Sequence, residues 1–350
     1  MDIIGLLKDE LSSFFGYGAL IDLLKKGDYS KLSSFDGIQA VVGPIIPILL
    51  IIEIIRAIAL KKFQGAQYRI PMLIYIFNRF IGRFIAIAVS VYCFGLFSRI
   101  SIIKTSFTWY WFIYGYIVWE LSHFVYHYFG HKVRLFWCLH STHHAPEHMN
   151  LTVSFAHFFL EGAYADIIRV SICALLGVNL LTLGIIVFID SFWGTFIHAG
   201  ENLIKDGRLG FLNNIILTPS HHRVHHSKNP LYMDTNFCNL LNIWDRVFRT
   251  YRPEREDIPP VYGITREMNP GSFLDVYFGE FVALGKDVYR APGLVNKLLY
   301  IIMPPGWSHT GHHKTSTAVR AEWLREQEKA RPEAKEPGHP AGPPVLADPA

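Results

Sequence analysis

Long apolar blocks are the feature of this sequence that most restricts how the chain can fold. The clearest block covers residues 38–60, and its charged residues, Glu53 and Arg56, are confined to its last third. A helix needs about 20 apolar residues to cross the hydrocarbon core of a bilayer. Pro44 and Pro47 lie early in the block, where a kink is tolerated within a bundle. With no cleavage-type signal before it, the block is expected to be a retained membrane anchor.

Further apolar blocks predict an all-α, integral-membrane bundle of about four spans with a cytoplasmic cap. The second and third spans are expected over residues 72–97 and 107–125. Residues 166–198 are divided near Gly177 and are expected to form a helical hairpin whose halves are short for a bilayer. Basic residues follow the first block and favour the cytoplasmic side. With that orientation, the hairpin puts every histidine cluster on one cytoplasmic face.

The rest of the chain is assigned by composition. Residues 1–37 are expected to be an N-terminal interfacial segment, and residues 38–313 the membrane domain. Residues 270–303 form an amphipathic stretch suited to a membrane surface or a lid. Residues 314–350 are charged and rich in proline and are expected to be a disordered tail, with a frayed helix as an alternative for its first part. The mild net charge of +4 and the lack of a basic stripe predict no nucleic-acid partner.

Three histidine clusters point to metal chemistry. One is an HxxxH motif and two are HxxHH motifs, and residues three or four apart share one face of a helix. Each cluster can therefore aim two imidazoles at one point. Eight imidazoles are too many for one ion, so the pattern predicts a di-metal site, and imidazole suits iron, zinc and copper. The eight candidate ligands are His127, His131, His140, His143, His144, His222, His225 and His226.

Other residues near the clusters are candidates for supporting roles. His198, at the return of the predicted hairpin, is a candidate ninth ligand. His123 and His221 are candidates to support a ligand from behind, as His123 shares a face with His127 and His221 precedes His222. Asp234 and Asp245 are candidate acceptors for imidazole N–H groups, with helix capping or surface pairing as the alternative. His148 and His157 are not preferred.

The motifs in their contexts resemble the fatty acid hydroxylase/sterol desaturase superfamily. Residues 124–150 carry the first two clusters, and residues 218–248 carry the third cluster followed by Asp-Thr-Asn and Asn-Ile-Trp-Asp-Arg-Val-Phe. Residues 261–265, 291–297 and 304–307 resemble the C-terminal region of the alkylglycerol monooxygenase branch. The resemblance is strong over about residues 107–250 and extends to about residue 310.

The resemblance implies two iron ions, O2, external electrons and a membrane lipid substrate, with ligand roles at the eight clustered histidines. It favours hydroxylation of a lipid C–H bond in a fatty acyl, sterol or alkyl ether lipid, with desaturation at the same site as the alternative. The first motif is commonly His-Arg-x-x-His, and in the branch an acidic residue follows its second histidine, whereas this chain has Tyr128 and Lys132 at these positions. These departures leave open whether electrons come from a pterin, another diffusible reductant or a donor protein. The expected location is a bacterial inner membrane or the endoplasmic reticulum.

Two other classes of protein compete with this interpretation. A zinc-dependent membrane hydrolase would typically carry HExxH, which supplies a general base beside two ligands, and the sequence has no such motif. A non-enzymatic metal-binding or transport protein is expected to place its ligands at mid-membrane on the spans. Here the clusters follow the ends of the predicted spans instead.

Overall fold

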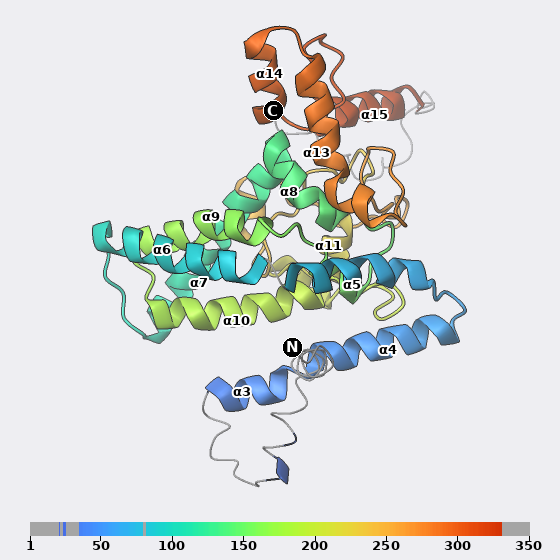
Figure 1. Ribbon diagram of the computed structural model, residues 1–350. Helices are drawn as coiled ribbons and strands as arrows, with labels where there is room; N and C mark the ends of the chain where they lie inside the picture. The colour runs from blue at the N-terminus through green and yellow to red at the C-terminus, as the bar shows by residue number, and fades with distance from the viewer. Residues whose placement is uncertain (1–20, 22–23, 26–34, 80–81, 331–350) are drawn as a thin grey trace, which may run out of the picture.

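The computed structural model describes residues 35–79 and 82–330, together with residues 21, 24 and 25 (Figure 1). Within these ranges the chain is helical and forms isolated bridges but no strand, which confirms the all-α prediction. Almost all of the predicted N-terminal interfacial segment, and the tail beyond residue 330, lie outside the described residues.

The α-helices are distributed along the whole described chain. The N-terminal half contains α3 (Phe35–Val42), α4 (Ile45–Ala59), α5 (Gly65–Arg79), α6 (Gly82–Ile100), α7 (Trp109–Lys132) and α8 (Arg134–His144). The C-terminal half contains α9 (Glu161–Leu175), α10 (Leu180–Phe196), α11 (Pro219–His225), α12 (Ile243–Val247), α13 (Phe273–Arg290), α14 (Gly293–Ile302) and α15 (Ser316–Ala330). The 3-10 helices are η2 (Leu151–Phe155) and η3 (Gly210–Asn214).

Helices α6, α7, α9 and α10 run side by side and form a bundle (Figure 1), in which α9 packs on α6 and α7 and α10 packs on α7. The α6–α7 and α9–α10 loops meet, because Thr105 Oγ1 donates to the Gly177 carbonyl at 2.7 Å and accepts from Asn179 N–H at 2.9 Å. Gly177 has a φ of 74°, and a Cβ there would lie 2.1 Å from the Ile103 carbonyl oxygen, so only glycine fits. These loops close one end of the bundle, and the candidate histidines lie at the other.

The span prediction is supported in part. One described helix, Ala40–Ala59, is long and apolar enough to cross a membrane, and Phe84–Ile100 and Leu180–Phe196 are shorter apolar helices. The 24-residue α7 is long, but its tryptophans, tyrosines and histidines lower its mean hydropathy. Large apolar side chains on α6 are exposed, with Phe84 at 75% and Val91 at 70%, which is the kind of surface that faces lipid. The number of spans stays a prediction.

Buried acidic side chains hold irregular loops near the candidate histidines. Glu120, on α7, accepts hydrogen bonds from three successive backbone N–H groups, those of residues 239–241, at 2.8–3.1 Å. Glu53, on α4, accepts from Leu151 N–H at 2.9 Å and Gly200 N–H at 3.0 Å. Backbone donors in such loops have no helical or sheet partner, and a buried donor without an acceptor is costly. Acidic side chains on two helices thereby fix loops that are far away in the sequence.

In the C-terminal region, the structure has a helix over the first part of the predicted tail, which was the alternative to disorder there. Residues 316–330 form α15, and two of its side chains contact the region around Tyr232. The buried Arg320 donates to the backbone carbonyls of Pro230 and Met233, and Trp323 packs against the apolar cluster around Tyr232. The stretch predicted to be amphipathic forms α13 and α14, which are separated at Pro292.

Candidate metal centre

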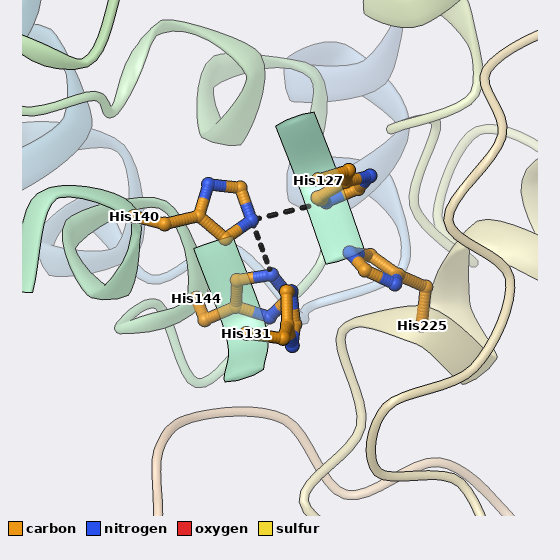
Figure 2. A group of neighbouring side chains, drawn as sticks. All are labelled: His127, His131, His140, His144 and His225. Atoms are coloured by element: carbon orange, nitrogen blue, oxygen red, sulfur yellow. Dashed lines mark hydrogen bonds between the residues drawn. The ribbon is translucent and has the colours of Figure 1, made fainter. Parts of the chain in front are cut away.

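The structure gathers the nine candidate ligands into two groups, and the ligand nitrogens within each group lie within 4.8 Å of one another. The first histidine group comprises His127, His131, His140, His144 and His225, whose rings face one another in Figure 2. The second histidine group comprises His143, His198, His222 and His226. All nine side chains are buried. Each group could hold one metal ion.

Helical spacing explains how each group is assembled. The pairs four residues apart stay together: His127 with His131 on α7, His140 with His144 on α8, and His222 with His226 at α11. His143 and His225 each lie one position away from such a pair, on a different face of the helix, and each joins the opposite group. Helices α8 and α11 therefore each contribute to both groups, which keeps the two groups adjacent.

Backbone carbonyls fix the tautomer of three imidazoles. The Nδ1 atom of His127 lies 2.8 Å from the Phe237 carbonyl oxygen, and that of His225 lies 2.8 Å from the Thr235 carbonyl oxygen. His198 makes the same contact with the carbonyl of Gly194 at 2.6 Å. A carbonyl only accepts hydrogen bonds, so each Nδ1 carries the proton and each Nε2 keeps a free lone pair. Those lone pairs are directed into the groups.

Two carboxylates fix the tautomer of two further imidazoles. Glu161 Oε1 lies 2.5 Å from His140 Nδ1, and its other oxygen lies 2.8 Å from His157 Nδ1. Asp234 Oδ1 lies 3.2 Å from His131 Nδ1, and its other oxygen accepts from Lys132 Nζ at 2.5 Å. Burial alone would raise the pKa of both carboxyls, but their histidine and lysine neighbours hold both pKa values below the usual range. Both groups are therefore ionised and accept the imidazole protons.

The arrangement of nitrogens fits bound cations. His127 Nε2 and His140 Nε2 lie 3.0 Å apart, although both rings carry their proton on Nδ1, so two lone pairs face each other. Two such atoms cannot hydrogen-bond, but two ligands at right angles, each about 2.1 Å from one ion, would lie about 3.0 Å apart. His131 Nε2 and His225 Nε2 are also buried without a hydrogen-bond partner among the described residues. Unshared lone pairs of this kind are what a metal ion accepts.

Burial also keeps these side chains in the form that binds metal. Desolvation lowers the pKa of His127, His143 and His222 well below the usual histidine value, and neighbouring imidazoles lower it further. The rings are therefore neutral near pH 7, and neutral imidazole is the ligand form that metals require. An all-imidazole donor set suits iron, zinc or copper.

The four candidate supporting residues have different positions. Asp234 contacts His131 directly, whereas Asp245 accepts from the N–H groups of residues 237 and 238 and so fixes the loop whose carbonyl holds His127. His123 packs edge-on against His127, with ring centroids 5.5 Å apart. His221 accepts from Thr218 N–H at the start of α11 and contacts the Tyr251 hydroxyl, so it orders the helix start.

Two further residues lie near the groups: Glu161, which the sequence did not single out, and His157, which was considered there but not preferred. Glu161 is the first residue of α9 and contacts His140, a member of the first histidine group. His157, which contacts the same carboxylate, stacks on His143 of the second histidine group with ring centroids 4.3 Å apart and an interplanar angle of 11°. The i,i+4 spacing of His157 and Glu161 is visible in the sequence, but their proximity to α8 is a tertiary contact. Glu161 thus links the two groups.

A cavity of about 340 Å³ opens onto the two histidine groups, and residues from the C-terminal part of the chain line its other side. Histidines of both groups line it: His131, His144 and His225 from the first and His226 from the second. A second cavity, of about 580 Å³, lies among α6, α7, α9 and α10. Its charged lining residues are Asp166, Arg169 and Asp190, and it is otherwise mainly apolar.

Comparison with known proteins identifies relatives for the part of the chain that carries the histidines. Residues 112–250 match the family model described as fatty acid hydroxylase. The chain is 33% identical over 189 residues to an alkylglycerol monooxygenase of Xenopus tropicalis, covering 54% of this chain and 40% of that protein. Over 198 residues it is 33% identical to the human alkylglycerol monooxygenase, covering 54% and 40%. It is 27% identical over 161 residues to the ornithine lipid hydroxylase OlsE of Rhizobium tropici, covering 45% and 46%.

The similarity is confined to part of each relative. The chain spans about two fifths of the length of the alkylglycerol monooxygenases that it matches. No solved structure matches the chain. Both histidine groups, together with Glu161, Asp234 and Asp245, lie inside the stretch matched by the family model. The predicted resemblance to the superfamily and to the alkylglycerol monooxygenase branch is confirmed.

Proposed function

From the match of residues 112–250 to the fatty acid hydroxylase family model, we propose that the protein is an O2-dependent, non-haem di-iron membrane enzyme that hydroxylates a lipid C–H bond. The observation that carries the proposal is the pair of buried, all-imidazole groups, in which His127 and His140 direct lone pairs at each other. The relatives support lipid oxidation, since they are named as monooxygenases of alkylglycerols and as a lipid hydroxylase.

In this proposal the nine histidines are ligands, and each group holds one iron ion. Bound iron supplies the activation of O2 and the oxidation of the C–H bond; one oxygen atom enters the lipid, the other leaves as water, and an external reductant supplies two electrons. The protein contributes orientation and protection from solvent. Glu161 and Asp234 accept the Nδ1 protons of His140 and His131 and aim both Nε2 atoms inward. Burial keeps the imidazoles neutral.

The proposal also places the metal centre at the cytoplasmic face of a multi-pass bundle. The exposed apolar faces of α4 and α6 support lipid contact on several helices, because Ile55 and Phe84 are both more than half exposed. The loops at Thr105 and Gly177 meet at the end of the bundle away from the histidines. Lys61 and Lys62 follow α4 directly, where basic residues favour a cytoplasmic loop.

The test combines metal analysis with lipid mass spectrometry on membranes from cells that express the protein or one of three variants. We expect iron and a lipid product with one added oxygen for the wild type, and loss of the product with a reduced iron content for His127→Ala, His143→Ala and His225→Ala. His312→Ala is the matched control, because His312 is exposed and belongs to neither group.

The product decides between the reactions that the site could perform. Loss of two hydrogens instead of a gain of oxygen would assign a desaturase, and an aldehyde with free glycerol would assign ether cleavage. Full iron content with unchanged product in all three variants would refute the proposal. Stoichiometric zinc without O2 consumption would favour the hydrolase instead.

A further inference from the structure

The cavity of about 340 Å³ at the metal centre, termed the chamber from here on, has chemically different walls. Four histidines of the two groups line one part of it. Lys228 and Lys314 line another part, and apolar side chains that include Trp137, Ile264 and Val319 complete it. A pocket with both cationic and apolar walls suits a molecule that is anionic at one end and apolar next to it.

The charges that line the chamber do not balance. Four cations line it, Arg134, Lys228, Arg266 and Lys314, against two acids, Asp234 and Glu280. Glu280 is already paired with Arg134 at 3.2 Å and Arg266 at 2.9 Å. Asp234 is occupied by His131, Lys132 and Ser316. Both acids that line the chamber therefore already have partners, and neither pairs with Lys228 or Lys314.

Both lysines are available to a ligand. Among the described residues, neither Lys228 Nζ nor Lys314 Nζ takes part in an ion pair or a hydrogen bond, and only their backbone N–H groups are engaged. Lys228 Nζ lies beside Gly263, which Glu147 also approaches, but the two side chains do not form an ion pair. Two unpaired ammonium groups on one cavity raise its positive potential and attract an anion.

The size of the chamber limits what can enter it. A volume of about 340 Å³ is near the lower end of typical ligand pockets. That space holds a phosphate or carboxylate and the first few carbons of a chain, but not a complete long-chain lipid. A lipid that places its head in the chamber must therefore leave most of its chain outside.

We infer that the chamber binds the anionic head, a phosphate or carboxylate, of a single-chain amphiphile through Lys228 and Lys314, and so presents the carbons next to the head to the histidines. The inference rests on the proposed function and adds a substrate class to it. The cavity within the bundle is unsuited to such a head. Its one cation, Arg169, is paired with Asp166 at 2.8 Å, and Asp190 adds another acid.

Binding to the metal-loaded, full-length protein in a neutral detergent tests the inference without relying on turnover. The probes are decyl phosphate, uncharged decanol and inorganic phosphate, and the readouts are titration calorimetry and the fluorescence change expected from Trp137. We expect decyl phosphate to bind about tenfold or more tightly than either other probe. A hydrogen bond to a charged group contributes about 1.5–3 kcal/mol, and 1.4 kcal/mol is a factor of ten in affinity.

Lysine variants test whether Lys228 and Lys314 cause the preference for decyl phosphate. Lys228→Gln with Lys314→Gln should weaken decyl phosphate binding at least tenfold and leave decanol binding unchanged, and the two Lys→Arg changes should restore it. Lys286→Gln is the matched control, because Lys286 is exposed on α13 and does not line the chamber. Equal binding of decyl phosphate by the wild type and the double glutamine variant would overturn the inference. Inorganic phosphate binding as tightly as decyl phosphate would overturn it as well, because the site would then take a free anion.

Failure of the inference and failure of the proposed function give different results. If the iron-loaded protein oxidises lipid but binds decyl phosphate independently of the lysines, the inference about the chamber is refuted and the proposed function stands. Lysine-dependent binding without any oxidised lipid would support the chamber as an anionic-head site and remove the oxygenase function. Iron content is measured on the same samples, so loss of metal is not mistaken for either result.

Discussion

The two histidine groups differ in how firmly the protein holds them. In the first histidine group, the Nδ1 atoms of His127, His131, His140 and His225 each contact a carbonyl or carboxylate oxygen. In the second histidine group, His198 has such a contact, to the Gly194 carbonyl. The Nδ1 atoms of His143 and His222 are buried without a hydrogen-bond partner among the described residues. The first group is therefore preorganised, whereas the second is held mainly by packing.

This difference has consequences for the metal ions that we propose. Hydrogen bonds behind a ligand fix its tautomer and orientation and raise its basicity, and losing one typically lowers metal affinity about 10–100-fold. The first group also offers five imidazoles and the second offers four. We expect the first group to retain its ion more tightly. The ion in the second group is then more easily lost and more free to change its coordination.

Removal of single ligands should give the largest effect. His222→Ala leaves three imidazoles in the second group, so iron should fall from about two ions per chain to about one. His144→Ala leaves four imidazoles in the first group, and most of both ions should remain. Iron per chain is measured by mass spectrometry on purified protein, and an unchanged size-exclusion profile shows that each variant is folded. A greater loss of iron from His144→Ala than from His222→Ala would mean that the second group, not the first, holds its ion more tightly.

Glu161→Gln should have an intermediate effect. The glutamine side chain keeps one acceptor oxygen, so His140 and His157 can no longer both donate to it, and the 2.5 Å contact with His140 loses its charge. We expect iron affinity of the first group to fall about 10–100-fold. Chelator competition in a His222→Ala background isolates this group. Glu147→Gln is the control, because Glu147 is exposed; an equal loss in both variants would argue against a specific role for Glu161.

Local spacing explains why the grouped histidines could be identified from the sequence as candidate ligands. Imidazoles three or four residues apart share a helix face, so the clusters identified eight histidines, and the predicted return of a hairpin identified His198. The division into two groups could not be predicted, because it depends on how α7, α8 and α11 meet. His143 and His144 are neighbours in sequence but belong to different groups. Glu161 was missed for the same reason, since its contact with His140 joins separate helices.

The fold, like the candidate site, could be predicted from the sequence only in part. The helical class and the apolar anchor follow from periodicity and hydropathy, and the structure has a suitable helix at Ala40–Ala59. For residues 316–330 the sequence offered a helix only as an alternative to disorder, because the order of this stretch depends on Arg320 reaching two backbone carbonyls near residue 230. Charged residues within apolar blocks were also ambiguous. Only the tertiary structure shows that Glu53 and Glu120 accept loop N–H groups.

The smallest effect on iron binding is expected where α15 contacts Asp234, the carboxylate that holds His131 of the first group. Ser316 donates to the Asp234 carboxylate, which also accepts from Lys132 and lies 3.2 Å from His131 Nδ1. Asp234→Asn should weaken iron binding by about tenfold, which is the lower end of the 10–100-fold range expected for a side chain that hydrogen-bonds to a ligand. The effect is smaller than at Glu161 because the contact of Asp234 with His131 is longer than that of Glu161 with His140. Ser316→Ala removes the hydrogen bond to Asp234 and a long one, of 3.4 Å, from Lys132. A single such bond is worth about 0.5–1.5 kcal/mol, so iron affinity should fall only about two- to tenfold.

The comparison between these two variants is informative because Lys132 remains in both. If Lys132 alone holds the carboxylate, Ser316→Ala should match the control Thr317→Ala, whose side chain is exposed. If α15 helps to position Asp234, Ser316→Ala should fall between Thr317→Ala and Asp234→Asn in chelator competition. An effect of Ser316→Ala as large as that of Asp234→Asn would contradict the ranking, because it would mean that the hydroxyl, rather than the carboxylate, sets the orientation of His131.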